Sequence, residues 1–436
     1  PTIGKLVNLR ELDLMGNKLT SLPENIGNLV GLTELNLESN ELTNLPKRIG
    51  DLVKLTKLNL YNNQLSSLPE SIGNLVGLTQ LSVYGNKLKS LPKSIGNLVG
   101  LRLLDLKYNE LTSLPESIGN LVYLINLNLR GNSVTVLPDC IGNLANLQEL
   151  DLTRNKLTSL PESIGNFKSI KKLNLYGNEL TALPDCIGNL VNLQKLDLDS
   201  NKITSLPESI GALVGLTKLS LNWDTFKEFP SSVINLVKLE KFDLSNNNLK
   251  SLPRNIEQIT SLKVLNVTGN PLRSLPKNIG NLIALDVLDL GASNLSELPE
   301  SIGKLVKLKT LNLKKSTLKT LPESIGNLVE LKELDLRNSQ LKTLPKSIGK
   351  LKNLEKLNLN WKVFESFPES IGQLDKITHL DLSHQNLSVL PECIEKLSSL
   401  KVLNITGNKL VKLPEDIGNL VNLTELDLKN SRLRTL

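Results

Sequence analysis

The sequence predicts an α/β solenoid, a curved stack of turns with a parallel sheet on its concave face and short helical or 3-10 turns on its convex face. Starting at Leu9, a leucine or isoleucine recurs every 23 residues, which gives 8 leading residues, 18 full units and a last unit of 14 residues. Each unit first alternates apolar and polar residues and then spaces its leucines by three and four. A period of roughly 20 to 50 residues is typical of arrays, because one unit cannot bury its leucines alone.

The unit reads L-x-x-L-x-L-x-x-N-x-L-x-x-L-P-x-x-I-G-x-L-x-x, counted from Leu9 as position 1. Leu12 and Leu14 alternate with Glu11 and Asp13, so we expect a half-buried strand here, followed by a tight, partly helical return. Proline occupies position 15 in all 18 full units, which suits the first residue of a helical turn or an extended corner. Asparagine at position 9 is expected to bond backbone groups that the bend leaves unpaired.

This LPxxIGxLxxL pattern resembles the 23-residue subtype of leucine-rich-repeat proteins, which is found in Ras-group scaffolds, in the arrays of Roco GTPases and in spirochaetal repeat proteins. The resemblance covers all 436 residues and implies a curved horseshoe, so residues 1–436 are expected to form a single leucine-rich-repeat domain of about 19 turns. Such arrays carry polar capping units at their ends, and neither is visible here. We therefore expect the natural ends to lie outside this sequence.

Two columns of the repeat carry exceptions. At position 19, glycine is replaced by Ile234 in one turn, which argues against an obligatory left-handed conformation. At position 9, serine is expected to be too short to span the backbone groups that asparagine joins, while Lys362 and Gln385 are expected to be too long for the slot. Because five exceptions are consecutive from Ser293, that stretch should be the softest of the array. The exceptions are Asp224, Ser293, Ser316, Ser339, Lys362, Gln385 and Ser431.

Catalytic and metal chemistry have little support in the sequence. It has two histidines and neither a glycine-rich phosphate loop nor a nucleophile elbow, so we expect no enzyme activity and no cofactor. His379, Asp381 and His384 fall in one turn and are weak candidates for zinc ligands. Residues two apart on a strand are separated by about 7 Å, however, and Gln385 is a poor fourth ligand. Ordinary surface histidines are therefore the preferred interpretation.

The three cysteines, Cys140, Cys186 and Cys393, each replace the usual serine at position 17. Cys140 and Cys186 are two turns apart, a separation of roughly 10 Å that is too large for a disulfide. We expect free thiols that stand in for serine. Free thiols are compatible with a reducing compartment and favour the cytoplasm, although the missing N-terminus leaves secretion open.

Tyrosine and tryptophan gather at positions 7 and 8, which we expect at the exposed end of the concave strand. Tyr61, Tyr84 and Tyr108 lie on adjacent turns and are expected to cluster within about 10 to 15 Å. Because these side chains combine a large area with a polar tip, they are predicted to anchor a partner; isolated surface aromatics are the alternative. The candidates are Tyr61, Tyr84, Tyr108, Tyr176, Trp223 and Trp361.

Charged and amide side chains form two further columns. Position 5 alternates between aspartate and asparagine over most turns from Asp105 onward, which predicts a structural ladder with an amide donor between like charges. Recognition of a cationic partner is the alternative. Beside it, position 3 is lysine in four successive turns, so the local charge is close to neutral. This argues against a nucleic-acid groove and favours a mixed-charge protein interface. The lysines are Lys172, Lys195, Lys218 and Lys241.

Composition agrees with a folded chain that has no membrane span. Hydrophobic residues make up 39% and charged residues 22%, the formal net charge is +7, and no apolar run is long enough for a transmembrane helix. The predicted function is a non-enzymatic scaffold that binds a protein or peptide, and not nucleic acid, on its concave face. The resemblance adds two alternatives: a regulatory array of a larger enzyme with a GTPase or ligase module, or a secreted or surface protein that binds a host.

Overall fold

The computed structural model describes residues 2–221, 229–253, 255–359 and 369–435. These residues separate into two compact units, Pro1–Leu219 and Ser220–Leu436. Each turn supplies one three-residue strand and one 3-10 helix of three to five residues, and the described residues contain nineteen of each. The single-domain interpretation stays a prediction. Trp223, Asp224, Trp361 and Lys362 lie outside the described residues.

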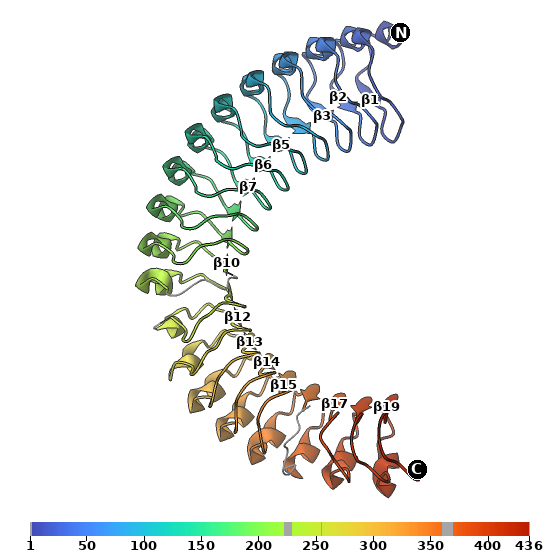
Figure 1. Ribbon diagram of the computed structural model, residues 1–436, viewed down its shortest axis with the longest axis vertical. Helices are drawn as coiled ribbons and strands as arrows, with labels where there is room; N and C mark the ends of the chain where they lie inside the picture. The colour runs from blue at the N-terminus through green and yellow to red at the C-terminus, as the bar shows by residue number, and fades with distance from the viewer. Residues whose placement is uncertain (1, 222–228, 254, 360–368, 436) are drawn as a thin grey trace. The chain divides into compact units, whose positions relative to one another are not determined.

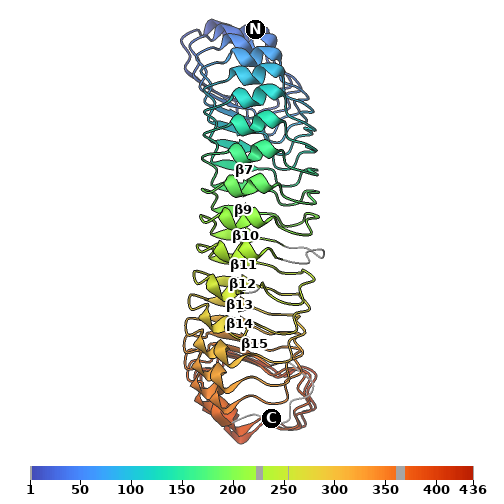
Figure 2. The ribbon, with the colours of Figure 1, turned by 90° about the vertical axis from the view of Figure 1, so that its left-hand side faces the viewer.

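The first unit is a curved stack in which the strands lie along the inner side and the helices along the outer side (Figure 1). Figure 2 looks onto the row of helices, which follow one another turn by turn. The strands are β1 (Glu11–Asp13), β2 (Glu34–Asn36), β3 (Lys57–Asn59), β4 (Gln80–Ser82), β5 (Leu103–Asp105), β6 (Asn126–Asn128), β7 (Glu149–Asp151), β8 (Lys172–Asn174), β9 (Lys195–Asp197) and β10 (Lys218–Ser220). The helices are η1 (Ile3–Lys5), η2 (Glu24–Asn28), η3 (Lys47–Asp51), η4 (Glu70–Asn74), η5 (Lys93–Asn97), η6 (Glu116–Asn120), η7 (Asp139–Asn143), η8 (Glu162–Asn166), η9 (Asp185–Asn189) and η10 (Glu208–Ala212).

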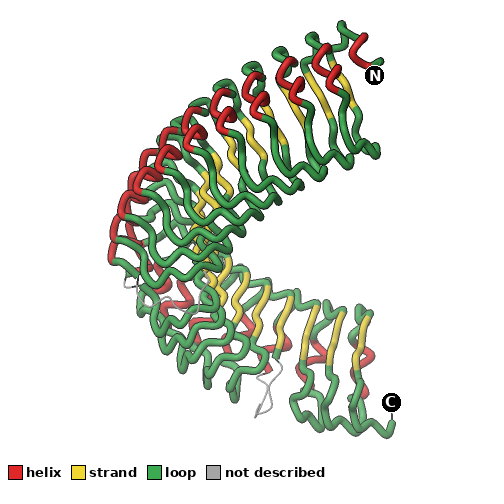
Figure 3. The backbone as a smooth tube through the Cα atoms, turned by 45° about the horizontal axis from the view of Figure 1, so that its top comes forward, coloured by secondary structure: helices red, strands yellow, loops and turns green. Residues whose placement is uncertain are grey.

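The second unit repeats this arrangement, with strands and helices on opposite sides of each turn (Figure 3). Its strands are β11 (Lys241–Asp243), β12 (Val264–Asn266), β13 (Val287–Asp289), β14 (Thr310–Asn312), β15 (Glu333–Asp335), β16 (Lys356–Asn358), β17 (His379–Asp381), β18 (Val402–Asn404) and β19 (Glu425–Asp427). Its helices are η11 (Ser231–Asn235), η12 (Ile256–Gln258), η13 (Ile279–Asn281), η14 (Glu300–Lys304), η15 (Glu323–Asn327), η16 (Lys346–Lys350), η17 (Glu369–Gln373), η18 (Glu392–Lys396) and η19 (Glu415–Asn419).

Neighbouring strands within each unit pair in parallel with a shift of one repeat. Leu12 of β1 pairs with Leu35 of β2, which in turn pairs with Leu58 of β3. The second unit shows the same register, for example between Leu265 and Leu288. Because equal repeat positions face each other, the leucines of successive turns stack into one aliphatic core, where Leu35 is 1% exposed. The predicted solenoid class is confirmed.

In the described turns, proline forms an extended corner after which the chain enters the 3-10 helix. Pro23 precedes η2 with φ −71° and ψ 147°. Its carbonyl accepts a hydrogen bond from the Ile26 N–H at 3.0 Å, and the Ile26 carbonyl accepts one from Leu29 at 3.0 Å. These three-residue spacings are those of a 3-10 helix, which suits a return that is too short for α-helical turns.

Glycine at position 19 is explained by the close approach of successive helices. A Cβ atom on Gly50 would lie 2.4 Å from the carbonyl oxygen of Ser71 and 2.8 Å from its Cβ. Gly50 does not have a left-handed φ, in agreement with the expectation drawn from Ile234. Glycine therefore sets how tightly the outer sides of neighbouring turns can pack.

The position-9 asparagines join neighbouring turns through their side chains. Oδ1 of Asn155 accepts a hydrogen bond from the Val134 N–H at 3.0 Å. Its Nδ2 donates to the carbonyl of Leu129 in the preceding turn at 2.9 Å and to that of Leu152 in its own turn at 3.0 Å. Asn155 is 7% exposed, so these backbone groups have little access to water. The predicted structural role of this column is confirmed.

The exceptions at position 9 behave differently from one another. The buried hydroxyl oxygens of Ser293, Ser316 and Ser339 have no hydrogen-bond partner within the described residues, as expected for a side chain that is too short. Gln385 enters the slot but does not reproduce all the bonds of asparagine. Gln385 is 4% exposed, and its Nε2 donates to the carbonyls of Leu359 and Ser383. Its buried Oε1 has no partner within the described residues, so glutamine replaces only part of the asparagine bonds.

None of the helices in the described ranges is long and apolar enough to span a membrane.

We expect Asn155→Ala to lower the free energy of unfolding by about 1–3 kcal/mol, because it leaves buried backbone groups of two turns unpaired. Urea denaturation followed by circular dichroism measures this change. Asn17→Ala is the matched control, since Asn17 is exposed and its amide donates to the carbonyls of Leu14 and Met15 within its own turn. Equal losses from the two substitutions would mean that bonding between turns does not stabilise the array.

Amide hydrogen exchange should be faster in strands β13–β15, whose turns contain the unpaired serines, than in β6–β9, whose turns contain asparagine. Stability in a repeat array is local, so a weak turn can open without the others. Strand β18 of the same unit is the internal control, because Asn408 in its turn makes the usual bonds of this column. Uniform protection across these strands would contradict this account of the exceptions.

Candidate functional site

The residue at position 5 ends each strand and folds the following residues into a tight turn. Oδ1 of Asn59 accepts the backbone N–H of Tyr61 at 3.1 Å, and Oδ1 of Asn174 accepts that of Tyr176 at 3.1 Å. This is the Asx-turn bond, made within one turn of the repeat. Tyr61 and Tyr176 occupy position 7 of the repeat, and Tyr108 occupies position 8, where its φ of 49° is left-handed. The tyrosines therefore lie in a turn beyond the strand, and not at the end of the strand as expected.

The same bond corrects the physical reason given for the position-5 ladder. An amide-to-carboxylate contact between turns does occur, from Nδ2 of Asn266 to Oδ2 of Asp243 at 3.3 Å. The recurrent interaction, however, is the local one, as from the Ser245 N–H to Asp243 at 3.0 Å. Alternating charge is thus secondary, and the column is occupied by aspartate and asparagine because both offer the Oδ1 acceptor that the turn needs.

Tyr61, Tyr84 and Tyr108 form a continuous stack, which we call the tyrosine ladder. The ring centroids of Tyr61 and Tyr84 are 4.5 Å apart with an interplanar angle of 25°, and those of Tyr84 and Tyr108 are 5.4 Å apart at 36°. These distances are shorter than the sequence-based expectation of a loose cluster. Burial, with smaller contributions from the two flanking tyrosines, raises the pKa of Tyr84. The raised pKa favours the neutral form of Tyr84, the middle ring.

Two cations contact the tyrosine ladder, and one of them, Lys107, is also paired with Asp105 at 3.2 Å. Nζ of Lys107 is 5.0 Å from the centroid of the Tyr84 ring, and Cζ of Arg130 is 5.9 Å from that of Tyr108. Such contacts hold the cations against the rings. Tyr176, the fourth predicted tyrosine, follows β8 and is not brought into the ladder. The sequence analysis did not select Lys107 and Arg130, although both occupy position 7, as Tyr61 and Tyr84 do.

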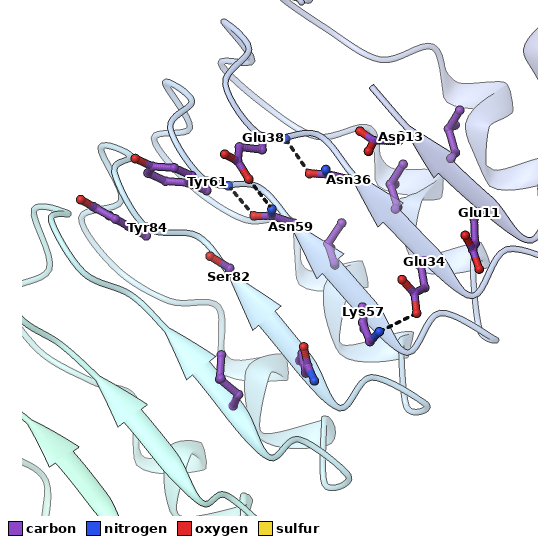
Figure 4. A pocket seen from close by; sticks show the side chains of 15 residues that line it. Glu11, Asp13, Glu34, Asn36, Glu38, Lys57, Asn59, Tyr61, Ser82 and Tyr84 are labelled. Atoms are coloured by element: carbon purple, nitrogen blue, oxygen red, sulfur yellow. Dashed lines mark hydrogen bonds and ion pairs between the residues drawn. The ribbon is translucent and has the colours of Figure 1, made fainter. Parts of the chain in front are cut away.

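A hollow of about 530 Å³ lies on the inner face of β1–β5, with Tyr61 and Tyr84 at one edge (Figure 4). Four carboxylates and one ammonium group line it. The ammonium of Lys57 donates to Glu34 at 2.6 Å, which raises the pKa of Lys57. Figure 4 also shows Glu38 accepting a hydrogen bond from Asn59, at 2.9 Å. The charged lining residues are Glu11, Asp13, Glu34, Glu38 and Lys57.

The sequence analysis missed these carboxylates. They occupy positions 3, 5 and 7 of the first two turns, which precede the aspartate and asparagine column that begins at Asp105. Reading each position along neighbouring turns, instead of searching for one long run, would have found them.

The predicted lysine row is balanced by acidic neighbours. A second hollow of about 200 Å³ over β7–β10 is lined by three lysines and three carboxylates. Lys172 forms an ion pair with Glu149, and Lys172 and Lys195 face each other in the register of β8 and β9. The lining consists of Glu149, Asp151, Lys172, Asp197, Lys195 and Lys218 with intervening strand residues. Lys241, the fourth predicted lysine, belongs to β11 in the second unit.

The candidate metal ligands are not brought together. His379 and Asp381 are the first and last residues of β17, and His384 lies in the following turn with φ 56°. Nδ1 of His379 is 2.9 Å from the Thr378 hydroxyl, and Asp381 accepts the Ser383 N–H at 2.9 Å. In the part of the chain that the structure describes, no three histidine, cysteine, aspartate or glutamate side chains are grouped closely enough to hold a metal ion.

The three cysteines are free thiols, as predicted. Burial, together with a hydrogen bond to Glu116, raises the pKa of Cys140 to about 11, and burial with a bond to Glu162 does the same for Cys186. Glu70 occupies the equivalent position beside Ser94, whose backbone N–H it accepts at 3.0 Å. Cysteine thus takes the structural place of serine on the outer side.

Family models describe almost the whole chain. One described as a leucine-rich repeat region matches residues 1–90, 47–128, 87–183, 162–268, 253–336, 300–384 and 321–407. A second, described as a leucine-rich repeat, matches residues 399–420. None of these models indicates a catalytic family. No curated protein matches the chain in sequence.

Several solved structures are similar over most of their length. A leucine-rich-repeat protein of Leptospira interrogans is 38% identical, with 86% of this chain and 97% of that chain covered and a TM-score of 0.78. The ectodomain of the Arabidopsis receptor kinase HAESA, in complex with an IDA peptide hormone, is 29% identical. The match covers 99% of this chain and 76% of that chain, with a TM-score of 0.70. The plant peptide hormone receptor RGFR1, in complex with RGF2, is 28% identical. The match covers 99% of this chain and 84% of that chain, with a TM-score of 0.65.

Cys140 and Cys186 should react slowly with iodoacetamide at pH 7.5. Their pKa of about 11, against an ordinary value of 9.0, leaves roughly a hundredfold less thiolate at that pH, and the thiolate is the nucleophile. Mass spectrometry of the native protein over pH 7.5 to 10.5 should show alkylation that rises with pH. The urea-unfolded chain is the control and should react at the rate of free cysteine; equally fast alkylation of the native protein would show that the thiols are not shielded.

Proposed function

The chain belongs to the leucine-rich-repeat family, and from the geometry of its first unit we propose that it is a non-enzymatic scaffold that binds a protein or extended peptide on the inner, strand-bearing face. The observation that carries this proposal is the tyrosine ladder, a stack of three rings beside a hollow. Tyrosine is a frequent anchor of interfaces, because its large surface is ordered at small entropic cost.

The arrangement of the ladder supports binding more than a structural role. Tyr108 is 40% exposed, and the rings lie in turns beyond the strands, outside the leucine core. Aromatic residues placed there contribute little to core packing and remain available to a partner. The similar structures of HAESA and RGFR1 hold peptide hormones, which makes an extended peptide a suitable class of ligand for this chain.

Mixed charge favours protein over nucleic acid as the partner. The lysines of β8–β10 share their hollow with three carboxylates, and the larger hollow carries four carboxylates. The larger hollow would repel a phosphate backbone, and the balanced one offers no excess positive charge to attract it.

The resemblance of the repeat motif implies two alternative functions, and each depends on segments outside this sequence. A regulatory array of an enzyme, as the Ras-group and Roco-type resemblance implies, would be supported by a GTPase or ligase domain in the full-length gene. A secreted or surface protein that binds a host would be supported by an export signal there.

Selection of a displayed random peptide library on the folded protein tests the proposed function. We expect enriched peptides to bind the native chain and to lose at least about 2 kcal/mol of binding free energy, roughly thirtyfold in affinity, when Tyr61, Tyr84 and Tyr108 are replaced together by alanine. The melting temperature should change little, since these rings lie outside the core.

Tyr123→Ala is the matched control, because Tyr123 is 58% exposed and lies outside the ladder. Its substitution should leave affinity unchanged. Failure to enrich any peptide, or equal affinity for the native chain and the triple variant, would refute the proposed function.

A further inference from the structure

Charged groups are ordered along the inner face of the first unit. Glu11 and Glu34 begin β1 and β2, and Glu38 follows β2. The tyrosine ladder occupies the next three turns. Lys107 lies in the last of these turns and is paired with Asp105 at 3.2 Å, and Arg130 follows β6 in the turn after it. Acidic, aromatic and cationic side chains therefore succeed one another in one direction across the strands.

The acidic end is not neutralised within the chain. Lys57 is paired with Glu34, but Glu11, Asp13 and Glu38 make no ion pair within the described residues. Four carboxylates against one ammonium leave the hollow with a net negative charge. An excess of like charges that face one hollow raises the affinity for a cationic group.

The dimensions of this face fit one extended chain. A three-residue strand is about 10 Å long, which is the width of a single peptide with its side chains. The five steps from β1 to β6 span roughly 24 Å at about 4.8 Å each, which corresponds to about seven extended residues. A short peptide could thus reach both ends of the charge order at once.

We propose that the first unit binds an extended peptide of segregated charge, which places a basic side chain in the hollow over β1–β3, an apolar or aromatic side chain against the tyrosine ladder, and an acidic side chain beside Arg130. This inference rests on the proposed function, and it adds the chemistry and order of the ligand. Each part of the peptide meets a group of complementary charge or polarity.

Three fluorescein-labelled nine-residue peptides test the proposal by fluorescence anisotropy. The first has two arginines, two phenylalanines and two glutamates in that order with serine spacers, the second has the same residues with the charges intermixed, and the third has glutamine in place of arginine. We expect the first to bind at least about tenfold more tightly than the other two, and to weaken as salt is raised from 50 to 300 mM.

Variants of the protein locate the basic contact. Glu11→Gln combined with Glu38→Gln should weaken the arginine peptide at least about fivefold and leave the glutamine peptide unchanged, since only the former meets the lost carboxylates. The Glu38→Gln substitution keeps an oxygen that can accept the hydrogen bond from Asn59. Glu333→Gln is the matched control, because Glu333 occupies the same repeat position in β15 of the second unit, and it should alter neither affinity.

Equal binding of the ordered and intermixed peptides, no binding of any of them, or equal loss with both peptides in the double variant would overturn the inference. These outcomes are distinguishable from failure of the proposed function. Library peptides that bind through the tyrosine ladder without a basic residue would refute the charge order alone, whereas an absence of ladder-dependent binders would refute both.

Discussion

The hydrogen bonds of the position-9 asparagine are the interaction on which the array depends. The chain turns back sharply after each strand, and this bend leaves carbonyl and N–H groups without strand or helix partners. Asn155 satisfies groups of the preceding turn and of its own turn with one amide. Because the bond crosses from one turn to the next, it fixes their spacing as well as closing the bend. The aliphatic core can then stack leucine on leucine without burying unpaired backbone.

This constraint leaves few positions free for function. Leucines fill the core, asparagine fills the bend, proline begins the return, and glycine permits the close approach of helices at Gly50. Positions 3, 7 and 8 face outward from the strand and the turn that follows it. They hold the tyrosines, three of the four carboxylates of the hollow and the two cations that contact the ladder. The scaffold therefore presents any side chains placed there at a spacing set by the strands, and a ligand would meet a surface that is already ordered.

The exceptions show which parts of the repeat are tolerant. Gln385 enters the slot and donates to the carbonyl of Ser383, whereas Ser316 reaches no partner among the described residues. Both side chains leave a buried oxygen without a hydrogen-bond partner in the described part of the chain, so neither fully replaces asparagine. Cysteine, by contrast, is tolerated on the outer side, where Cys140 keeps the contact to a glutamate.

The sequence alone determined the fold, because a strict period of 23 residues specifies register, core and return together, and any other arrangement would expose the leucines. It also identified the tyrosines from their shared repeat positions. Only the tertiary structure decided that Tyr61, Tyr84 and Tyr108 stack ring on ring, that Tyr176 lies apart, and that His379, Asp381 and His384 do not converge. It likewise decided that Asp243 and its equivalents bond their own turn. These outcomes depend on side-chain rotamers and on distances between turns, which a linear pattern constrains to a column but not to a contact.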